Sequence, residues 1–536
     1  MSQRSSLAWL WRALGIAVAL LVALPLLSLL WQWTTLGTGE GRIWQHLLET
    51  KLDRLALNTL VLLLGVACGV GVLGVALAAL VSFCEFPLRR AIEWLLLLPM
   101  AIPGYVMAFV FLGIFSFAGP LQTSLRQWFG TQYWFPDVQS PLMVILVFTL
   151  VLYPYVYLLA RAAFLSQGRN LIDAARTLGL SAPQAFFRVA LPVARPAIAG
   201  GIALVLMETL ADFGAVSVFN YDTFTTAIYN AWSGLFNLAV AAQLATLLLL
   251  FVVVTQVLEK YSRQGARFVR DERSRDVQRF HLRGLRAVVA TLACLLVVAV
   301  AFLMPLAQLL VWVVAAGASE YDRRYPEFLG HTLGLAALTA ALAVALALLL
   351  SLLQRLRGSA FVRRLQQSAV RISTLGYAVP GSVLAVGILL ILTLIDRRLG
   401  LSLVGTVLAL ILAYLTRFLA VAQTPVDAAM ERIRPSLQEA ARTLGVGGSA
   451  LIRRLHVPLL WPSLLTAGLM VFVDVMKEMP ATLILRPFGW DTLAVRVYQM
   501  TAEGQWQRAA LPAVTLLLAG LVPVILLLRQ SGKAKG

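Results

Sequence analysis

The stretch Ile172–Gly179 reads Ile-Asp-Ala-Ala-Arg-Thr-Leu-Gly, and Gln438–Gly445 reads Gln-Glu-Ala-Ala-Arg-Thr-Leu-Gly. The two stretches are offset by 438 − 172 = 266 residues. The same offset relates the prolines that follow them: Pro192 with Pro458, and Pro196 with Pro462. A second pair of similar stretches precedes the loops: Ala101–Val106 resembles Ala378–Val383, at an offset of 378 − 101 = 277. The chain therefore reads as a duplication whose two halves have diverged in loop length.

Composition decides the class of protein around these loops. Of 536 residues, 60% are hydrophobic and 13% are charged, and the mean hydropathy is +0.84. Soluble domains carry about 25% charged residues, so a soluble enzyme and a disordered chain are both excluded. The apolar runs are long and unbroken, which indicates helices rather than barrel strands. The sequence predicts an all-α polytopic membrane protein.

Twelve apolar runs are long enough to span a bilayer. They cover residues 12–33, 57–82, 92–116, 141–164, 196–219, 235–258, 287–315, 331–354, 369–395, 401–424, 463–486 and 508–529. Gly65 and Gly69, in the second run, have the four-residue spacing that lets membrane helices pack closely. Six runs in each half make a parallel repeat, since each half then enters the membrane in the same direction.

The basic residues set the orientation. Most of the 44 Lys and Arg lie in alternate connections, and the segment 259–286 alone has nine basic residues against four acidic ones. This bias predicts cytoplasmic termini and a cytoplasmic linker. The net charge of +19 is therefore a topology signal, and no nucleic-acid partner is expected. The predicted organisation is a first domain 1–258, a basic linker 259–286 and a second domain 287–536.

Locally, each repeated loop predicts a short helix. Ser436 and Glu439 have the spacing of a capping box, with Ser436 at the N-cap. Asn170 and Asp173 occupy the corresponding places in the first copy. Gly179 and Gly445 are placed to end the helices in the left-handed conformation. An acid at a helix start can be purely structural, but capping does not explain why Ala-Ala-Arg-Thr-Leu-Gly recurs, so we favour a docking role.

The spacing of acid, Ala-Ala and Gly, followed thirteen residues later by a hydrophobic residue and Pro, resembles the EAA loop of ABC importer inner-membrane permeases. The resemblance covers nearly the whole chain as two fused permease domains of the type I importer fold, with loops at 170–196 and 436–462. It implies that the loops are coupling helices for a cytoplasmic ATPase. The coupling residues implied are Asp173, Ala174, Ala175, Gly179, Glu439, Ala440, Ala441 and Gly445. The first copy departs from the pattern by having Asp in place of Glu.

The same resemblance implies the partners. Two copies of an ABC ATPase subunit would dock beneath the membrane, and a periplasmic binding protein would deliver substrate to this bacterial inner-membrane subunit. The chain has no phosphate-binding loop, because its only Gly-Lys, Gly532-Lys533, lacks the upstream glycine. ATP is therefore expected on the partner subunits, and this chain is expected to be a transport subunit and no enzyme, without a cofactor of its own.

The substrate is indicated by resemblance alone. The stretches Ala211–Ser217, Thr223–Tyr229 and Lys477–Leu483 are similar to those of fused Fe(III) transport permeases. Permeases for thiamine, phosphonate and polyamines share the architecture, so these substrates stay open. A secondary transporter driven by an ion gradient is the rival class, and the duplicated loop is what argues against it.

Two pairs of carboxylates lie in apolar runs. Glu208 and Asp212 recur at the 266-residue offset as Asp474 and Glu478. Acids inside a span usually face a bundle interior or a water-filled cavity, and their oxygens suit a hard cation. They are the predicted translocation path; the alternative is that they pair with Lys477 or arginines and shape a gate. No high-affinity metal site is expected, because the four histidines are scattered: His46, His281, His331 and His456.

Overall fold

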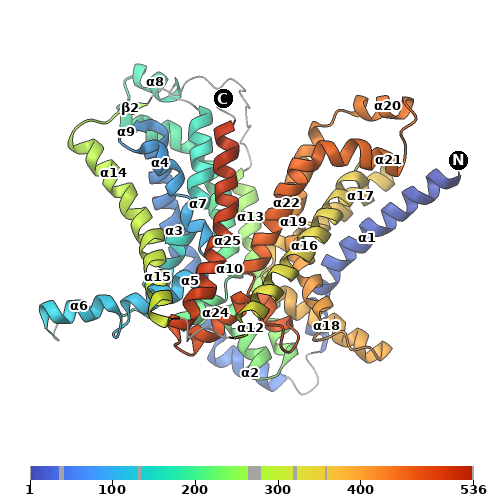
Figure 1. The fold of residues 1–536 in the computed structure, drawn as a ribbon, viewed down its shortest axis with the longest axis horizontal. Coiled ribbons are helices and arrows are strands. Elements are labelled where there is room, and N and C mark those ends of the chain that lie inside the picture. The colour runs from blue at the N-terminus through green and yellow to red at the C-terminus, as the bar shows by residue number, and fades with distance from the viewer. Residues whose placement is uncertain are drawn as a thin grey trace. The chain divides into compact units, whose positions relative to one another are not determined.

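A computed structural model describes residues 2–35, 41–130, 134–167, 170–263, 279–317, 323–355 and 359–533. Helices account for nearly all of the regular structure, and the described residues hold one two-stranded sheet (Figure 1). Of the predicted linker 259–286, residues 264–278 lie outside the described ranges. The helical class read from composition is confirmed.

Ten helical segments within these ranges are long and apolar enough to cross a membrane. They are Trp11–Thr34, Leu52–Phe83, Gly104–Phe129, Pro141–Ser166, Pro183–Ala211, Leu238–Tyr261, Leu285–Ala316, Tyr325–Leu353, Val407–Arg432 and Ile452–Lys477. An eleventh candidate is the pair Ala360–Ala378 and Gly381–Leu399, which is bent by 119° at its break. Trp506–Val522 is a shorter apolar helix. Each lies where an apolar run was predicted, and the count of twelve stays a prediction.

The long helices keep much of their apolar surface exposed. Only 33% of the most apolar window of Leu52–Phe83 is buried. On the helix that starts at Leu285, the exposed residues Val288, Leu292 and Leu296 form a stripe at four-residue spacing. An apolar stripe of this length does not suit water, whereas hydrocarbon accepts it because the helix satisfies its own backbone hydrogen bonds.

The chain forms two compact units. The first, here called the α3 unit, comprises residues 46–227, 247–321 and 497–536. Its elements are α3 (Leu52–Phe83), β1 (Cys84–Glu85), α4 (Arg89–Leu95), α5 (Gly104–Phe115), α6 (Pro120–Phe129), α7 (Pro141–Gln167), α8 (Asn170–Thr177), α9 (Ala182–Ala185), α10 (Leu191–Ala211), α11 (Gly214–Val218), β2 (Phe280–His281), α14 (Leu285–Val298), α15 (Met304–Ala316) and α25 (Trp506–Lys533). Helices α3, α7 and α10 pack against one another, and α15 packs against α25 and α5.

The second, here called the α16 unit, comprises residues 1–45, 228–246 and 322–496. Its elements are α1 (Ser2–Trp31), α16 (Tyr325–Leu353), α17 (Ala360–Ser373), α18 (Gly381–Leu399), α19 (Val407–Arg432), α20 (Pro435–Thr443), α21 (Ser449–Leu451), α22 (Val457–Lys477) and α23 (Pro480–Leu485). Helices α16, α19 and α22 form a packed trio that matches the trio of the α3 unit. Four more helices have residues in both units: α2 (Gly41–Thr50), α12 (Phe224–Ser233), α13 (Leu238–Arg263) and α24 (Leu493–Ala502).

The first span of each predicted half packs within the unit that holds the other half's trio. Helix α1 contacts α16, α17 and α18, and the hydroxyl of Ser28 lies 3.1 Å from the carbonyl oxygen of Gly387. In the α3 unit, α14 and α15 contact α4 and α5. The compact units group helices by their contacts, whereas the predicted domains 1–258 and 287–536 follow the order of the duplicated halves. The predicted division into domains therefore stays a prediction.

Glycines allow the close contact of α3 with α7. A Cβ atom on Gly65 would collide with the side chain of Ile145, and one on Gly69 with that of Thr149. The predicted packing role of the two glycines is confirmed.

Four predicted spans are broken in the part of the chain that the structure describes, and one of them is the run 369–395, which is the bent pair Ala360–Ala378 and Gly381–Leu399. The run 92–116 contains α4, a 3₁₀ turn at Leu98–Ala101 and α5, because Pro99 and Pro103 interrupt the helix. The runs 196–219 and 463–486 each end their long helix early, at Ala211 and at Lys477. Both breaks fall beside acids of the predicted translocation path.

Candidate functional site

The two repeated loops adopt the same local structure. Gly179, two residues after the end of α8, has φ +89°, and Gly445, two residues after the end of α20, has φ +79°. The Leu180 N–H donates to the Ala175 carbonyl (3.2 Å), as the Val446 N–H does to that of Ala441 (2.9 Å). These are the hydrogen bonds of a Schellman motif, in which a left-handed residue ends the helix. The prediction of left-handed glycines is confirmed.

The starts of the helices differ from the predicted capping box. Helix α20 begins at Pro435, so Ser436 lies in its first turn and not before it. Proline is favourable at this position because its fixed φ suits a helix and its missing N–H has no helical partner to lose. Helix α8 begins at Asn170, whose side chain lies outside the description.

The residues of the repeated loops divide into supporting and exposed positions. Ala175 is buried, Asp173 and Ala441 are half-buried, and Ala174, Glu439 and Ala440 are exposed. Sequence reasoning missed two further residues, because nothing in a hydropathy profile distinguishes a buried leucine from an exposed one. Leu178 and Leu444 occupy equivalent places, and their side chains are 85% and 82% exposed. A single exposed leucine is common on protein surfaces, and what marks these two is that they recur at equivalent places in both loops.

The acids at the two breaks share one geometry. Asp212 leaves the helix in an extended conformation, and its Oδ1 accepts from the Ala215 N–H (2.7 Å) at the start of α11. Glu478 does the same for α23, with its Oε1 accepting from the Ala481 N–H (3.0 Å). Each acid therefore ends one helix and caps the next, which satisfies an N–H that has no helical partner. Asp212 and Glu478 therefore lie just past the ends of α10 and α22, and not within continuous helices over the predicted runs 196–219 and 463–486.

Each break brings an acid of the predicted translocation path against a glycine of the repeated stretches Ala101–Val106 and Ala378–Val383. A Cβ atom on Gly104 would lie 2.8 Å from Oδ2 of Asp212, and one on Gly381 would lie 2.5 Å from Oε1 of Glu478. Each glycine is the first residue of a helix, α5 or α18, so each carboxylate meets a helix N-terminus. The positive end of a helix favours a negative charge there. A Cβ atom at either place would push the carboxylate away from its present position.

The two carboxylates differ in their partners. The Nε of Arg417, on α19, lies 3.4 Å from Oε2 of Glu478. The position 417 − 266 = 151 holds Val151, so the first half has no arginine there. The Glu478–Arg417 ion pair is the arrangement expected if this acid shapes a gate. Glu208, Asp212 and Asp474 are half-buried, which leaves their role in a path as a prediction.

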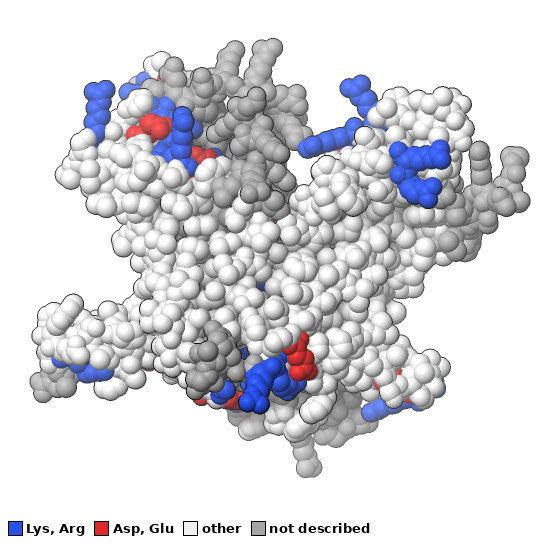
Figure 2. Space-filling model, in the orientation of Figure 1, with Lys and Arg blue, Asp and Glu red and all other residues white. Residues whose placement is uncertain are grey.

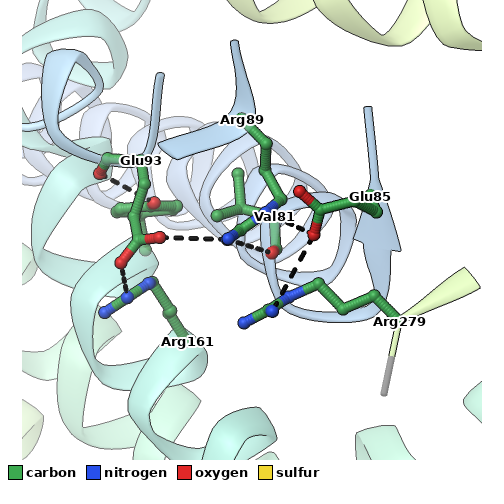
Figure 3. Close-up of polar contacts among 7 residues, drawn as sticks. Val81, Glu85, Arg89, Glu93, Arg161 and Arg279 are labelled. Atoms are coloured by element: carbon green, nitrogen blue, oxygen red, sulfur yellow. Dashed lines mark hydrogen bonds and ion pairs between the residues drawn. The ribbon is translucent and has the colours of Figure 1, made fainter. Parts of the chain in front are cut away.

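A cluster of charged side chains lies where α4 meets the end of α7 (Figure 3). Glu93 forms an ion pair with Arg161 of α7 and another with Arg89 (3.0 Å), and only 5% of Glu93 is exposed. Buried carboxylates of this kind are stable only when paired. The position equivalent to Arg161 in the second half is Asp427, which accepts a hydrogen bond from Ser351 (2.6 Å). Both spans that lead into the repeated loops are thus fastened, by different groups.

Figure 2 shows Lys and Arg over α8 and β2 in one unit and beside α21 in the other, and further Lys and Arg along the lower edge of the view. The exposed arginines around α8 and β2 are Arg90, Arg176, Arg188, Arg283 and Arg286. Burial lowers the pKa of Arg279, next to β2, and the neighbouring Arg89 lowers it further. This end of the α3 unit is therefore a basic surface suited to an acidic partner.

No group of three or more His, Cys, Asp or Glu that could hold a metal ion occurs in the ranges that the structure describes. Two of the histidines have contacts of another kind, one with an aromatic ring and one with a residue of the second repeated loop. His331 stacks on Trp490, with ring centroids 4.4 Å apart, and His456 lies 2.9 Å from the Gln438 side chain. The absence of a high-affinity metal site stays a prediction for the whole chain.

Paired helical trios, broken spans and duplicated loops at the basic ends define a duplicated membrane permease. The chain matches the family of binding-protein-dependent transport system inner membrane components over residues 69–267 and 344–532, and it belongs to that family. It is thus a multi-pass inner-membrane protein and the permease component of an ABC system, a transport subunit that is not itself an enzyme. The family implies an ABC ATPase and a binding protein as partners.

Three relatives illustrate the similarity. The Fe(3+)-transport system permease protein FbpB 2 of Haemophilus influenzae is 28% identical over 530 residues, covering 97% of both chains. The molybdenum transport system permease protein ModB of Escherichia coli is 30% identical over 27% of this chain and 62% of its own. The sulfate transport system permease protein CysW of Escherichia coli is 32% identical over 39% of this chain and 70% of its own.

Proposed function

We propose that the chain carries ferric iron from a periplasmic binding protein into the cytoplasm, driven by two copies of an ABC ATPase subunit. Its twelve spans form two parallel six-helix repeats of the type I importer fold, in domains 1–258 and 287–536 with the linker 259–286 between them. Both termini are cytoplasmic. The ATPase subunits bind ATP and dock at α8 and α20, and closure of the ATPase pair drives alternating access.

One observation carries the docking assignment. Two loops that are 266 residues apart end in the same left-handed glycine, with the same hydrogen bonds and an equally exposed leucine. Stability alone does not require Leu178 and Leu444 to be exposed at equivalent tips. Two matching surfaces fit two copies of one partner. A secondary transporter has no use for paired docking loops, so we favour the ATP-driven class.

Two observations together support ferric iron as the substrate. The relative named for Fe(3+) transport matches along nearly the whole chain, whereas ModB and CysW each match less than half of it. Carboxylates occur at both helix breaks, Asp212 and Glu478, and oxygen ligands suit a hard cation. A permease that held iron tightly would not release it inside, so we place a weak, oxygen-lined path at Glu208, Asp212, Asp474 and Glu478 and assign specificity largely to the binding protein.

Iron-loaded binding protein is expected to raise ATP hydrolysis and uptake of radiolabelled iron together. The measurement uses the permease–ATPase complex reconstituted in liposomes, with metal-free binding protein as the control. Thiamine, phosphonate, polyamine, molybdate and sulfate carried by their own binding proteins are the alternatives. Stimulation by one of these partners, with no response to the iron-loaded one, would overturn the iron assignment and leave the importer class intact.

The proposed topology predicts which side chains are reached from outside. Cysteine introduced at Phe488, a fully exposed side chain between α23 and α24, should react with an impermeant maleimide in intact spheroplasts. Cysteine introduced at Leu444 should react only after the membrane is opened. Labelling at position 444 but not at position 488 in intact spheroplasts would show that the orientation is reversed.

A further inference from the structure

The end of the linker is attached to the α3 unit by backbone pairing. Strand β2 pairs in parallel with β1, placing Phe280 opposite Cys84 and His281 opposite Glu85. The Leu282 N–H donates to the Glu85 carbonyl oxygen (3.0 Å). The linker residues 279–282 are thus held in this unit by backbone hydrogen bonds.

Side-chain charges reinforce the attachment (Figure 3). Arg279 lies 3.8 Å from Glu85, and Glu85 pairs with Arg89 (2.9 Å). Arg89 in turn reaches Glu93, which pairs with Arg161 at the end of α7. A continuous chain of ion pairs therefore runs from the linker to the helix that leads into α8.

The linker also contacts α8 itself. The guanidinium of Arg176 lies over the ring of Phe280, 5.7 Å from its centre, within the range of a cation–π interaction. His281, the next residue, is exposed. In Figure 1, β2 lies beside α8 and α9 at one end of the α3 unit.

The second loop is fastened by its own half. The side chain of Gln438, in α20, lies 2.9 Å from that of His456, in the π-helical turn before α22. The positions 438 − 266 = 172 and 456 − 266 = 190 hold Ile172 and Ala190, which cannot make this hydrogen bond. At α8, the contact of Arg176 with Phe280 of the linker takes the place of the contact that Gln438 makes with His456 at α20.

We propose that the linker residues Arg279–Leu282 are a built part of the first ATPase-docking surface. Phe280 positions α8 through Arg176, and His281 contacts the docked ATPase subunit beside Leu178. The two ATPase copies then meet different surfaces, one made of a loop and a linker strand and the other of a loop alone. This inference rests on the proposed docking of an ATPase at α8 and α20.

The positioning role is tested by the amount of iron transported per ATP hydrolysed in the reconstituted complex. Phe280→Leu keeps an apolar side chain but removes the ring face, and it should lower this ratio about two- to fivefold, the equilibrium equivalent of one cation–π contact. Phe280→Trp keeps the face and should retain the ratio. Phe488→Leu, the same exchange at a fully exposed ring between α23 and α24, is the matched control. Equal ratios in Phe280→Leu and the native chain would overturn the positioning role.

The contact is tested by photo-crosslinking from p-benzoylphenylalanine placed singly at His281, Leu178, Leu444 and Phe488 in the whole complex. The first three should cross-link to the ATPase subunit, and position 488 should not. Cross-linking from 178 and 444 but not from 281, or cross-linking from 281 to phospholipid alone, would overturn this inference and leave the importer proposal standing. No cross-link to the ATPase from 178 or 444 would overturn the docking assignment itself.

Discussion

Replacing Gly179 and Gly445 together by valine should remove most iron uptake while the permease still inserts and folds. Both glycines have positive φ, and a β-branched residue there costs about 1–3 kcal/mol of backbone strain. Relief of that strain unwinds the ends of α8 and α20 and moves Leu178 and Leu444. Since about 1.4 kcal/mol is a factor of ten, transport coupled to ATP hydrolysis should fall at least about tenfold.

The same loop offers a matched control. Gly447 has open space around it and no positive φ, so Gly447→Val adds an identical side chain two residues from Gly445 without strain. It should leave uptake unchanged. The measurement is iron uptake and ATP hydrolysis in liposomes, with co-purified ATPase as the assembly readout. Normal coupling in the double glycine variant would show that these helix ends do not transmit the ATPase cycle.

The repeated loops could be predicted because their structure is local. A glycine that ends a helix needs only its own φ and two backbone hydrogen bonds, so the spacing around Gly179 and Gly445 was sufficient. The start of α20 was predicted less well, since Pro435 and Ser436 are both suited to a helix start. Proline took the first helical position, so the helix starts two residues earlier than a cap at Ser436 predicts.

The helix breaks could not be predicted from hydropathy. A window of about twenty residues averages over Asp212 and Glu478, and both breaks are followed by apolar sequence. The signals were present as spacing: each acid lies three residues before the N–H that it accepts, and each has a glycine at a distant helix start. Only the structure joins Gly104 to Asp212 and Gly381 to Glu478, because the contact is tertiary.

The choice of neighbours was also beyond the sequence. Apolar runs identify spans but do not show which helices pack against one another, because lipid and a neighbouring helix are equally apolar. Helix α1 packs on α16, α17 and α18, although it belongs by duplication to the other half. The exposure of Leu178 and Leu444 could not be predicted either, because a hydropathy scale gives leucine the same high value whether its side chain is buried or exposed.

Neutralising the two helix-break carboxylates should reduce iron uptake without preventing assembly. In Asp212→Asn and Glu478→Gln the amide oxygen can still accept from Ala215 or Ala481, so both helix caps survive. What disappears is the negative charge. Interactions of a charged group are worth about 1.5–3 kcal/mol, so each change should lower uptake about tenfold or more if the cation meets that carboxylate. The double change should cost less than the sum if the two acids act as one site.

Glu478→Gln also leaves Arg417 without its carboxylate, and a buried unpaired charge lowers stability by itself. The double variant Glu478→Gln with Arg417→Leu separates the two effects, because it removes the stranded charge together with the acid. Thermal stability of the purified complex should recover in this double variant while iron uptake stays low. Recovery of both would mean that Glu478 serves Arg417 and the gate alone. Asp212→Asn keeps the hydrogen bond to the Ala215 N–H and should lower uptake, and unchanged uptake there would remove the acids from the translocation path.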